Sequence, residues 1–165
     1  MTESRSDLLR SNSYSFCRAL ITPPPPSQMI SQFFTCAHPR ITEHGPKWSQ
    51  SRLPFLSKTF SGSSGPGSCE TYFEVLSQTL KMHMHDTTFP SLEGFIVDPE
   101  AVAEGSEGKG VVCVVGKGGF ESVSTGKRWE EKFIYRLSGF DDEGKIGHWV
   151  CIRLLFRQME VKGLY

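Results

Sequence analysis

The sequence predicts an α+β fold, in which helices near the N-terminus pack on one side of an antiparallel β-sheet. Three observations predict it. The chain has 165 residues, which is the length of one ordinary domain. Apolar residues recur at helical spacing in its first half, and after residue 81 the pattern changes to short alternating runs separated by turn residues. Helices that precede a series of antiparallel strands usually cover one face of the resulting sheet.

The first predicted helix covers residues 7–20. Either Ser6 or Asp7 is a suitable N-cap, and the helix must end before Pro23, because the residue before a proline avoids the α-helical region. The apolar positions that would face the core are Leu8, Leu9, Phe16 and Leu20. Residues 1–6 are expected to be a disordered N-terminus, and residues 7–155 a single domain.

Two further helices are predicted before the sheet begins. Residues 27–34 form a short one after the proline-rich linker 23–26, and residues 69–81 have the best helical spacing in the chain. Between them we expect a brief strand at 40–44, a helical turn or two within 48–56 and a flexible loop at 61–68.

The second half is predicted to be strands. The expected strands cover residues 81–86, 95–98, 110–115, 120–124, 128–137 and 145–155. The glycine-rich segments 108–110 and 116–119 resemble phosphate-binding loops, but neither precedes a helix, so we interpret both as hairpin turns. Asp141, Asp142, Glu143 and Gly144 are expected to form a four-residue turn between the last two strands.

That turn length fixes a predicted register. A four-residue loop places Leu137 opposite His148 and Tyr135 opposite Val150. Because side chains alternate along a strand, Glu131 and Tyr135 share the apolar face of their strand, and this register puts His148 on the same face. A slip of one residue would move His148 to the other face.

The predicted group of Glu131, Tyr135 and His148 is either a structural network or a site, because buried polar groups need hydrogen-bond partners. In a site, His148 would be the general acid or base, Tyr135 would donate to a substrate oxygen, and Glu131 would orient the imidazole or take a proton. His44 is a further candidate catalytic residue, since it lies with Glu43 at a strand end, where side chains often rim a pocket.

Composition argues against several other classes. Lys plus Arg and Asp plus Glu each total 18, so the net charge is zero, which disfavours binding to nucleic acid or to a membrane surface. His83 and His85 could hold one metal ion from a strand, but no second ligand pair is evident, so neither a metal nor a cofactor is predicted. The five cysteines include no CxxC pair, and no secretion signal is seen, so we expect reduced thiols and a cytoplasmic location.

Several short strings resemble a known family. They are Arg40-Ile41-Thr42-Glu43-His44-Gly45-Pro46, Arg52-Leu53-Pro54-Phe55-Leu56, Thr59-Phe60-Ser61-Gly62, Thr125-Gly126-Lys127-Arg128-Trp129 and Gly147-His148-Trp149. Together with others between residues 8 and 149, they resemble fungal SnoaL-like proteins of the nuclear-transport-factor-two-like superfamily.

The resemblance implies a cone of helices wrapped by a curved antiparallel sheet around a ligand cavity, and often a homodimer formed through the sheet. It also implies a hydrophobic small-molecule ligand, polyketide-like or terpenoid-like. The expected activity is that of a cofactor-independent cyclase, dehydratase or isomerase that works by proton transfer. The alternative is a non-catalytic ligand-binding or dimerisation module, because fold alone does not determine function.

The C-terminus departs from that family. After Trp149 the family continues with an acidic and aromatic string, whereas this chain continues with Val150-Cys151-Ile152-Arg153 and an atypical tail at 156–165. Codons for Val-Cys can match a fungal splice donor, so residues 150–165 are either the authentic C-terminus or a translated intron. A cDNA that runs unbroken across this junction would refute the intron hypothesis.

Overall fold

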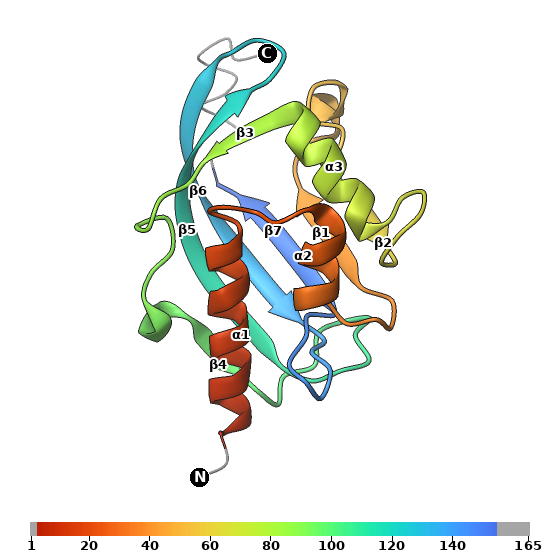
Figure 1. Cartoon of the computed structure of the whole chain (residues 1–165), viewed down its shortest axis with the longest axis vertical. Coiled ribbons are helices and arrows are strands. Elements are labelled where there is room, and N and C mark those ends of the chain that lie inside the picture. The colour runs from red at the N-terminus through yellow and green to blue at the C-terminus, as the bar shows by residue number, and fades with distance from the viewer. Residues whose placement is uncertain (1–2, 155–165) are drawn as a thin grey trace.

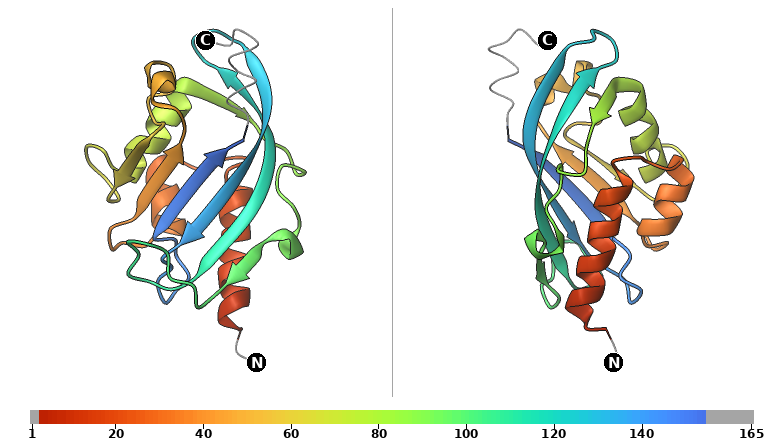
Figure 2. Two further views of the ribbon diagram at one scale, coloured as in Figure 1. Left: turned by 180° about the vertical axis from the view of Figure 1, so that it is seen from behind. Right: turned by 60° about the vertical axis from the view of Figure 1, so that its left-hand side comes forward.

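The computed structural model describes residues 3–154, which form an α+β fold with the helices on one side of a curved, open sheet (Figure 1). The edge-on view in Figure 2 separates the sheet from the helical layer. The predicted fold class is therefore confirmed. In chain order the elements are α1 (Arg5–Ala19), α2 (Pro26–Phe33), β1 (Arg40–His44), the 3-10 helix η1 (Lys47–Ser51), β2 (Lys58–Ser61), α3 (Cys69–Thr79), β3 (Leu80–His83), the 3-10 helix η2 (Leu92–Gly94), β4 (Ile96–Asp98), β5 (Val111–Ser122), β6 (Arg128–Ser138) and β7 (His148–Arg153).

Helix α1 begins two residues earlier than expected. Ser4, rather than Ser6 or Asp7, is the N-cap, and its side chain accepts a hydrogen bond from the backbone N–H of Asp7. The Asp7 carboxylate lies in the first turn, where it favours the positive end of the helix dipole. The face of α1 that carries Leu9 and Phe16 is buried against the sheet.

The seven strands form one mixed sheet. Their order is β2-β1-β7-β6-β5-β3, and β4 pairs with β5 beside β3. The predicted all-antiparallel pairing is wrong at one place, because β1 and β7 run parallel. These two strands are far apart in the chain, so no tight hairpin forces them to run in opposite directions. Strand β2, which was not predicted, pairs with β1 at the sheet edge.

Strand β5 corrects the prediction of a turn at residues 116–119. It is a single strand of 12 residues that runs straight through this glycine-rich segment. Gly116 lies opposite Phe133 of β6, and a Cβ atom at Gly116 would lie 2.2 Å from Cε2 of that ring. Glycine is therefore required here for close packing of an aromatic ring, not for a change of chain direction.

Two glycines of β5 give a matched test of this explanation. We expect Gly116→Ala to destabilise the protein by about 1–3 kcal/mol through overpacking. Gly118→Ala should be neutral or stabilising by up to about 1 kcal/mol, because its Cβ would meet neighbours no closer than 3.7 Å. Urea denaturation of both variants measures the difference, and equal stabilities would contradict the steric explanation.

The β6–β7 hairpin has a shorter loop than predicted. Asp141 and Lys145 pair directly through a backbone hydrogen bond of 3.0 Å, which leaves residues 142–144 as a three-residue loop. Gly144 closes this loop with a φ of +75°, the conformation that such loops place at their last position. The register therefore shifts by one residue, so that Ser138 lies opposite His148, Leu137 opposite Trp149 and Tyr135 opposite Cys151.

The core between the sheet and the helices is largely aromatic. Trp149 is its centre, because its ring contacts those of Phe16 on α1, Tyr72 and Phe73 on α3, and Tyr135 on β6. None of the helices within residues 3–154 has the length and apolar character needed to cross a bilayer.

Candidate functional site

Three charged side chains are buried on the inner, helix-facing side of the sheet. Glu43 of β1 and Glu131 of β6 are each 1% exposed, and Arg153 of β7 is 8% exposed. The Arg153 Nε donates to Glu43 Oε1, and its Nη1 donates to Glu131 Oε1. One guanidinium thus joins two carboxylates from different strands. We call these three residues the inner charge cluster.

The register explains why these residues meet. Arg153 lies opposite Phe133 on the neighbouring strand, and Glu131 is two residues away from Phe133 on the same face. Glu43 belongs to the strand on the other side of β7, and it shares its face with the buried Ile41. The central strand β7 therefore carries its arginine between the two glutamates.

Two buried tyrosines adjoin the inner charge cluster. The Tyr72 hydroxyl donates to Glu43 Oε2 over 2.7 Å, whereas the Tyr135 hydroxyl makes no hydrogen bond with any of residues 3–154. Burial raises the pKa of both phenols well above 10, and the negative charge of Glu43 adds to the increase. Both tyrosines are therefore protonated hydrogen-bond donors at neutral pH.

A small cavity lies between the tyrosines and the inner charge cluster. Its volume is about 10 Å³, which is the space of about one water molecule. The inner face of the sheet is therefore nearly filled at this point, and the cavity here is too small for the ligand that the resemblance implied. The lining residues are Glu43, Tyr72, Leu76, Met82, Phe120, Phe133, Tyr135, Trp149, Cys151 and Arg153.

His148 is not part of this interior. The one-residue shift in register turns its side chain to the outer face of the sheet, away from Tyr135 and Glu131, so the prediction that the three share one face is wrong. The imidazole Nε2 instead lies 2.9 Å from the Thr42 hydroxyl. Desolvation lowers the pKa of His148 to about 4, and the nearby positive charge of Arg40 contributes.

This shift predicts how stability depends on pH. The pKa of His148 is about 4 in the folded protein, against 6.5 for an ordinary histidine, so between these values the unfolded chain binds a proton that the folded chain does not. We expect the free energy of unfolding to fall as the pH decreases from 6.5 towards 4. The loss should be smaller in His148→Gln than in the wild type, as measured by urea denaturation at several pH values. Equal pH dependence in the two proteins would contradict the shift.

Glu43 and His44, at the end of β1, have their side chains on opposite faces of the sheet. His44 is exposed on the outer side, and Glu43 points into the core. Sequence reasoning selected His44 and missed Glu43, Tyr72 and Arg153 as site residues. Alternation from the apolar Ile41 was a signal for Glu43, because residues two apart on a strand share a face. The position of Arg153 on the inner face could be found only from the register of β6 and β7, and that register was predicted with an error of one residue.

The two candidate metal ligands, His83 and His85, are not part of the inner charge cluster. His83 forms a 3.0 Å contact with Glu121 Oε2 near the tip of the β5–β6 hairpin, where Lys81 and Arg128 also contact this carboxylate. Within residues 3–154, no three side chains of the metal-ligating kinds converge on one point. His83 therefore contacts a carboxylate that two cationic side chains also contact.

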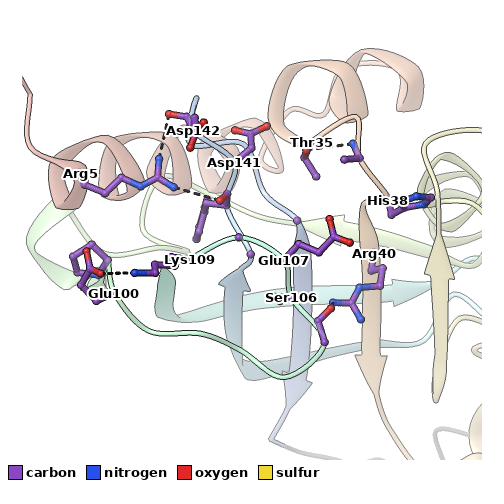
Figure 3. A pocket seen from close by; sticks show the side chains of 17 residues that line it. Arg5, Thr35, His38, Arg40, Glu100, Ser106, Glu107, Lys109, Asp141 and Asp142 are labelled. Carbon is purple, nitrogen blue, oxygen red and sulfur yellow. Dashed lines mark hydrogen bonds and ion pairs between the residues drawn. The ribbon is translucent and has the colours of Figure 1, made fainter.

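A second candidate pocket is a separate open groove of about 860 Å³ at one end of the sheet (Figure 3). Its wall carries charges of both signs, and several of its cations already have partners. Arg5 donates to two backbone carbonyls of the β6–β7 loop, Lys109 pairs with Glu100 at 3.0 Å, and Arg40 donates to the Gly105 carbonyl. This groove lacks a buried ionisable group, so the inner charge cluster is the stronger candidate site.

No family model and no curated protein match this chain. Solved structures do match, at low identity. A putative isomerase from Bacillus subtilis is 10% identical with a TM-score of 0.62, and the match covers 98% of this chain and 96% of that one. A putative polyketide cyclase from Xanthomonas campestris pv. campestris is 11% identical with a TM-score of 0.62, covering 95% and 98%.

An NTF2-like protein from Burkholderia xenovorans is also similar, at 11% identity and a TM-score of 0.62, with 90% of this chain and 91% of that chain covered. NTF2 stands for nuclear transport factor two, so this likeness agrees with the superfamily that the sequence resembles. At such identities the likeness establishes the fold. The chain has the cone-type architecture of NTF2-like proteins.

Proposed function

We propose that the protein binds a small hydrophobic molecule inside the cone and catalyses proton transfer on it without a cofactor. The reaction class is isomerisation, cyclisation or dehydration of a polyketide-like or terpenoid-like carbonyl compound. One observation carries the proposal: a buried carboxylate, Glu43, and a buried phenol, Tyr135, line the same apolar cavity. Similar folds in proteins described as a putative isomerase and a putative polyketide cyclase support it.

The proposed roles follow from the contacts. Glu43 is the general base, which takes a proton from the carbon next to a substrate carbonyl. Tyr135 donates a hydrogen bond to the oxygen on which negative charge develops, and Glu43 then returns the proton to another carbon. Tyr72 and Arg153 are positioning residues, since both hold the Glu43 carboxylate. Glu131 holds Arg153, and the two histidines His44 and His148 have no role at this site.

Substrate binding requires the cavity to enlarge, because its present volume accommodates about one water molecule. Met82 and Leu76 form part of the lining, and methionine in particular adapts its shape readily. We expect these two side chains to move when a ligand enters.

Exchange of carbon-bound protons tests the proposal. Wild-type protein in D₂O, incubated with a panel of hydrophobic ketones and β-ketoesters, should accelerate deuterium incorporation next to the carbonyl, as followed by NMR. Glu43→Gln should lose about 10²–10⁴-fold of this rate. Glu130→Gln is the control, because Glu130 is exposed on the outer face of the sheet. The proposal fails if no compound exchanges, or if the Glu43 variant exchanges as fast as the wild type.

The alternative of a dimerisation module is favoured by the outer face of the sheet, which none of the helices within residues 3–154 covers (Figure 2). Ile96, Val115 and Ile152 are 74%, 54% and 40% exposed there, and the latter two lie in one row across β5, β6 and β7. We propose that a second copy of the chain covers this face. Sedimentation should then give twice the 18.5 kDa monomer mass, and Val115→Arg should return the protein to the monomer.

A further inference from the structure

The inner charge cluster has one negative charge in excess. It contains two carboxylates and one guanidinium, and no other charged side chain is buried among residues 3–154. The adjacent phenols, Tyr72 and Tyr135, stay neutral because their pKa values are raised. An unbalanced charge in an apolar interior is unfavourable unless a proton or another cation compensates for it.

Several polar groups of this interior lack partners among residues 3–154, and they include the buried indole N–H of Trp149. The Oε2 atom of Glu131 is buried and accepts no hydrogen bond from the described residues, although its Oε1 contacts Arg153. Tyr135 lines the cavity at 4% exposure, and its hydroxyl bonds to none of residues 3–154. Buried polar atoms are nearly always satisfied, so unpaired ones in a charged cluster indicate a missing partner.

The surrounding rings suit a cation. The guanidinium of Arg153 lies 4.7 Å from the centroid of Phe120 and 5.9 Å from that of Phe55. The cavity is also lined by Phe133 and Trp149, whose ring faces can attract positive charge in the same way. The interior already accommodates one planar cation between carboxylates and aromatic rings.

We propose that the small apolar ligand of this interior also carries an organic cation, namely an ammonium, amidinium or guanidinium group. The cation supplies the missing positive charge, and the apolar body packs against the aromatic lining. This inference rests on the proposed ligand site inside the cone but not on any turnover there.

Isosteric probe pairs test the charge requirement on the wild-type protein. Benzamidinium should bind at least about tenfold more tightly than benzamide, and methylguanidinium more tightly than methylurea, as measured by calorimetry at pH 7. Equal affinity within both pairs, or no binding of either cation, would overturn the proposal.

Adjacent residues of β6 supply a matched pair of variants. Glu131→Gln removes the excess charge and should abolish the preference for the cation, whereas Glu130→Gln changes an exposed residue on the opposite face and should preserve it. Retention of the preference in the Glu131 variant would also overturn the inference. If that variant does not fold, the wild-type comparison still decides. Cation binding without proton exchange on any carbonyl compound would refute the proposed catalysis and leave this inference standing.

Discussion

Replacing Arg153 by methionine should destabilise the protein by about 3–5 kcal/mol. The substitution keeps an unbranched side chain of similar length but leaves the carboxylates of Glu43 and Glu131 buried without their shared cation. Removing one partner of a buried ion pair costs this much because the remaining charge stays desolvated. Urea denaturation at pH 7 measures the loss.

A control shows whether the loss comes from buried charge. Arg128→Met removes an arginine that is 70% exposed in its ion pair with Glu121, and it should cost no more than about 1 kcal/mol. A loss at pH 7 below about 1 kcal/mol in Arg153→Met would contradict the account.

Trp149→Ala should produce a similarly large loss, about 3–5 kcal/mol. The indole ring is 1% exposed and lies between the sheet and the helices α1 and α3. Its centroid is 5.0 Å from the ring centroids of Phe16 and Tyr135. Its removal leaves a large void between these layers. Thermal and urea denaturation measure the effect.

The matched control is Trp129→Ala. Trp129 is partly buried on the same face of the sheet and stacks on Phe120 at 6.1 Å. We expect its loss to be less than half of that at Trp149. If the two variants are equally destabilised, Trp149 is not the centre of the core.

Local patterns were sufficient to predict the three α-helices and most of the strands. The helix at residues 69–79 and the strand at 40–44 could be found because apolar spacing and turn residues act over a few positions. The glycine-rich segment within β5 could not, since the reason for Gly116 is a ring on the neighbouring strand. Glycine marks both turns and close packing, and the sequence does not distinguish them.

The candidate site was harder to predict because its contacts are not local. Arg153 and Glu43 are 110 positions apart and meet only because β7 inserts beside β1 in a parallel pairing. The position of His148 depended on a single residue in the β6–β7 loop. A three-residue loop instead of a four-residue one moved the imidazole to the outer face and placed Trp149, Cys151 and Arg153 inside.

Residues 150–153 belong to the central strand β7, paired on both sides, and Arg153 faces inward to two carboxylates. Arg153 therefore does not lie at an edge of the sheet. The atypical tail at 156–165 lies outside the described residues. Whether residues 150–165 are the authentic C-terminus or a translated intron depends on the sequence of the transcript.

The inner charge cluster is the basis of both the proposed chemistry and the proposed ligand class, and a double-mutant cycle between Glu43→Gln and Arg153→Met tests it most directly. We predict a coupling energy of about 2–3 kcal/mol, because each variant removes one side of the same buried contact. A coupling energy below about 0.5 kcal/mol would mean that the two side chains do not meet inside the cone.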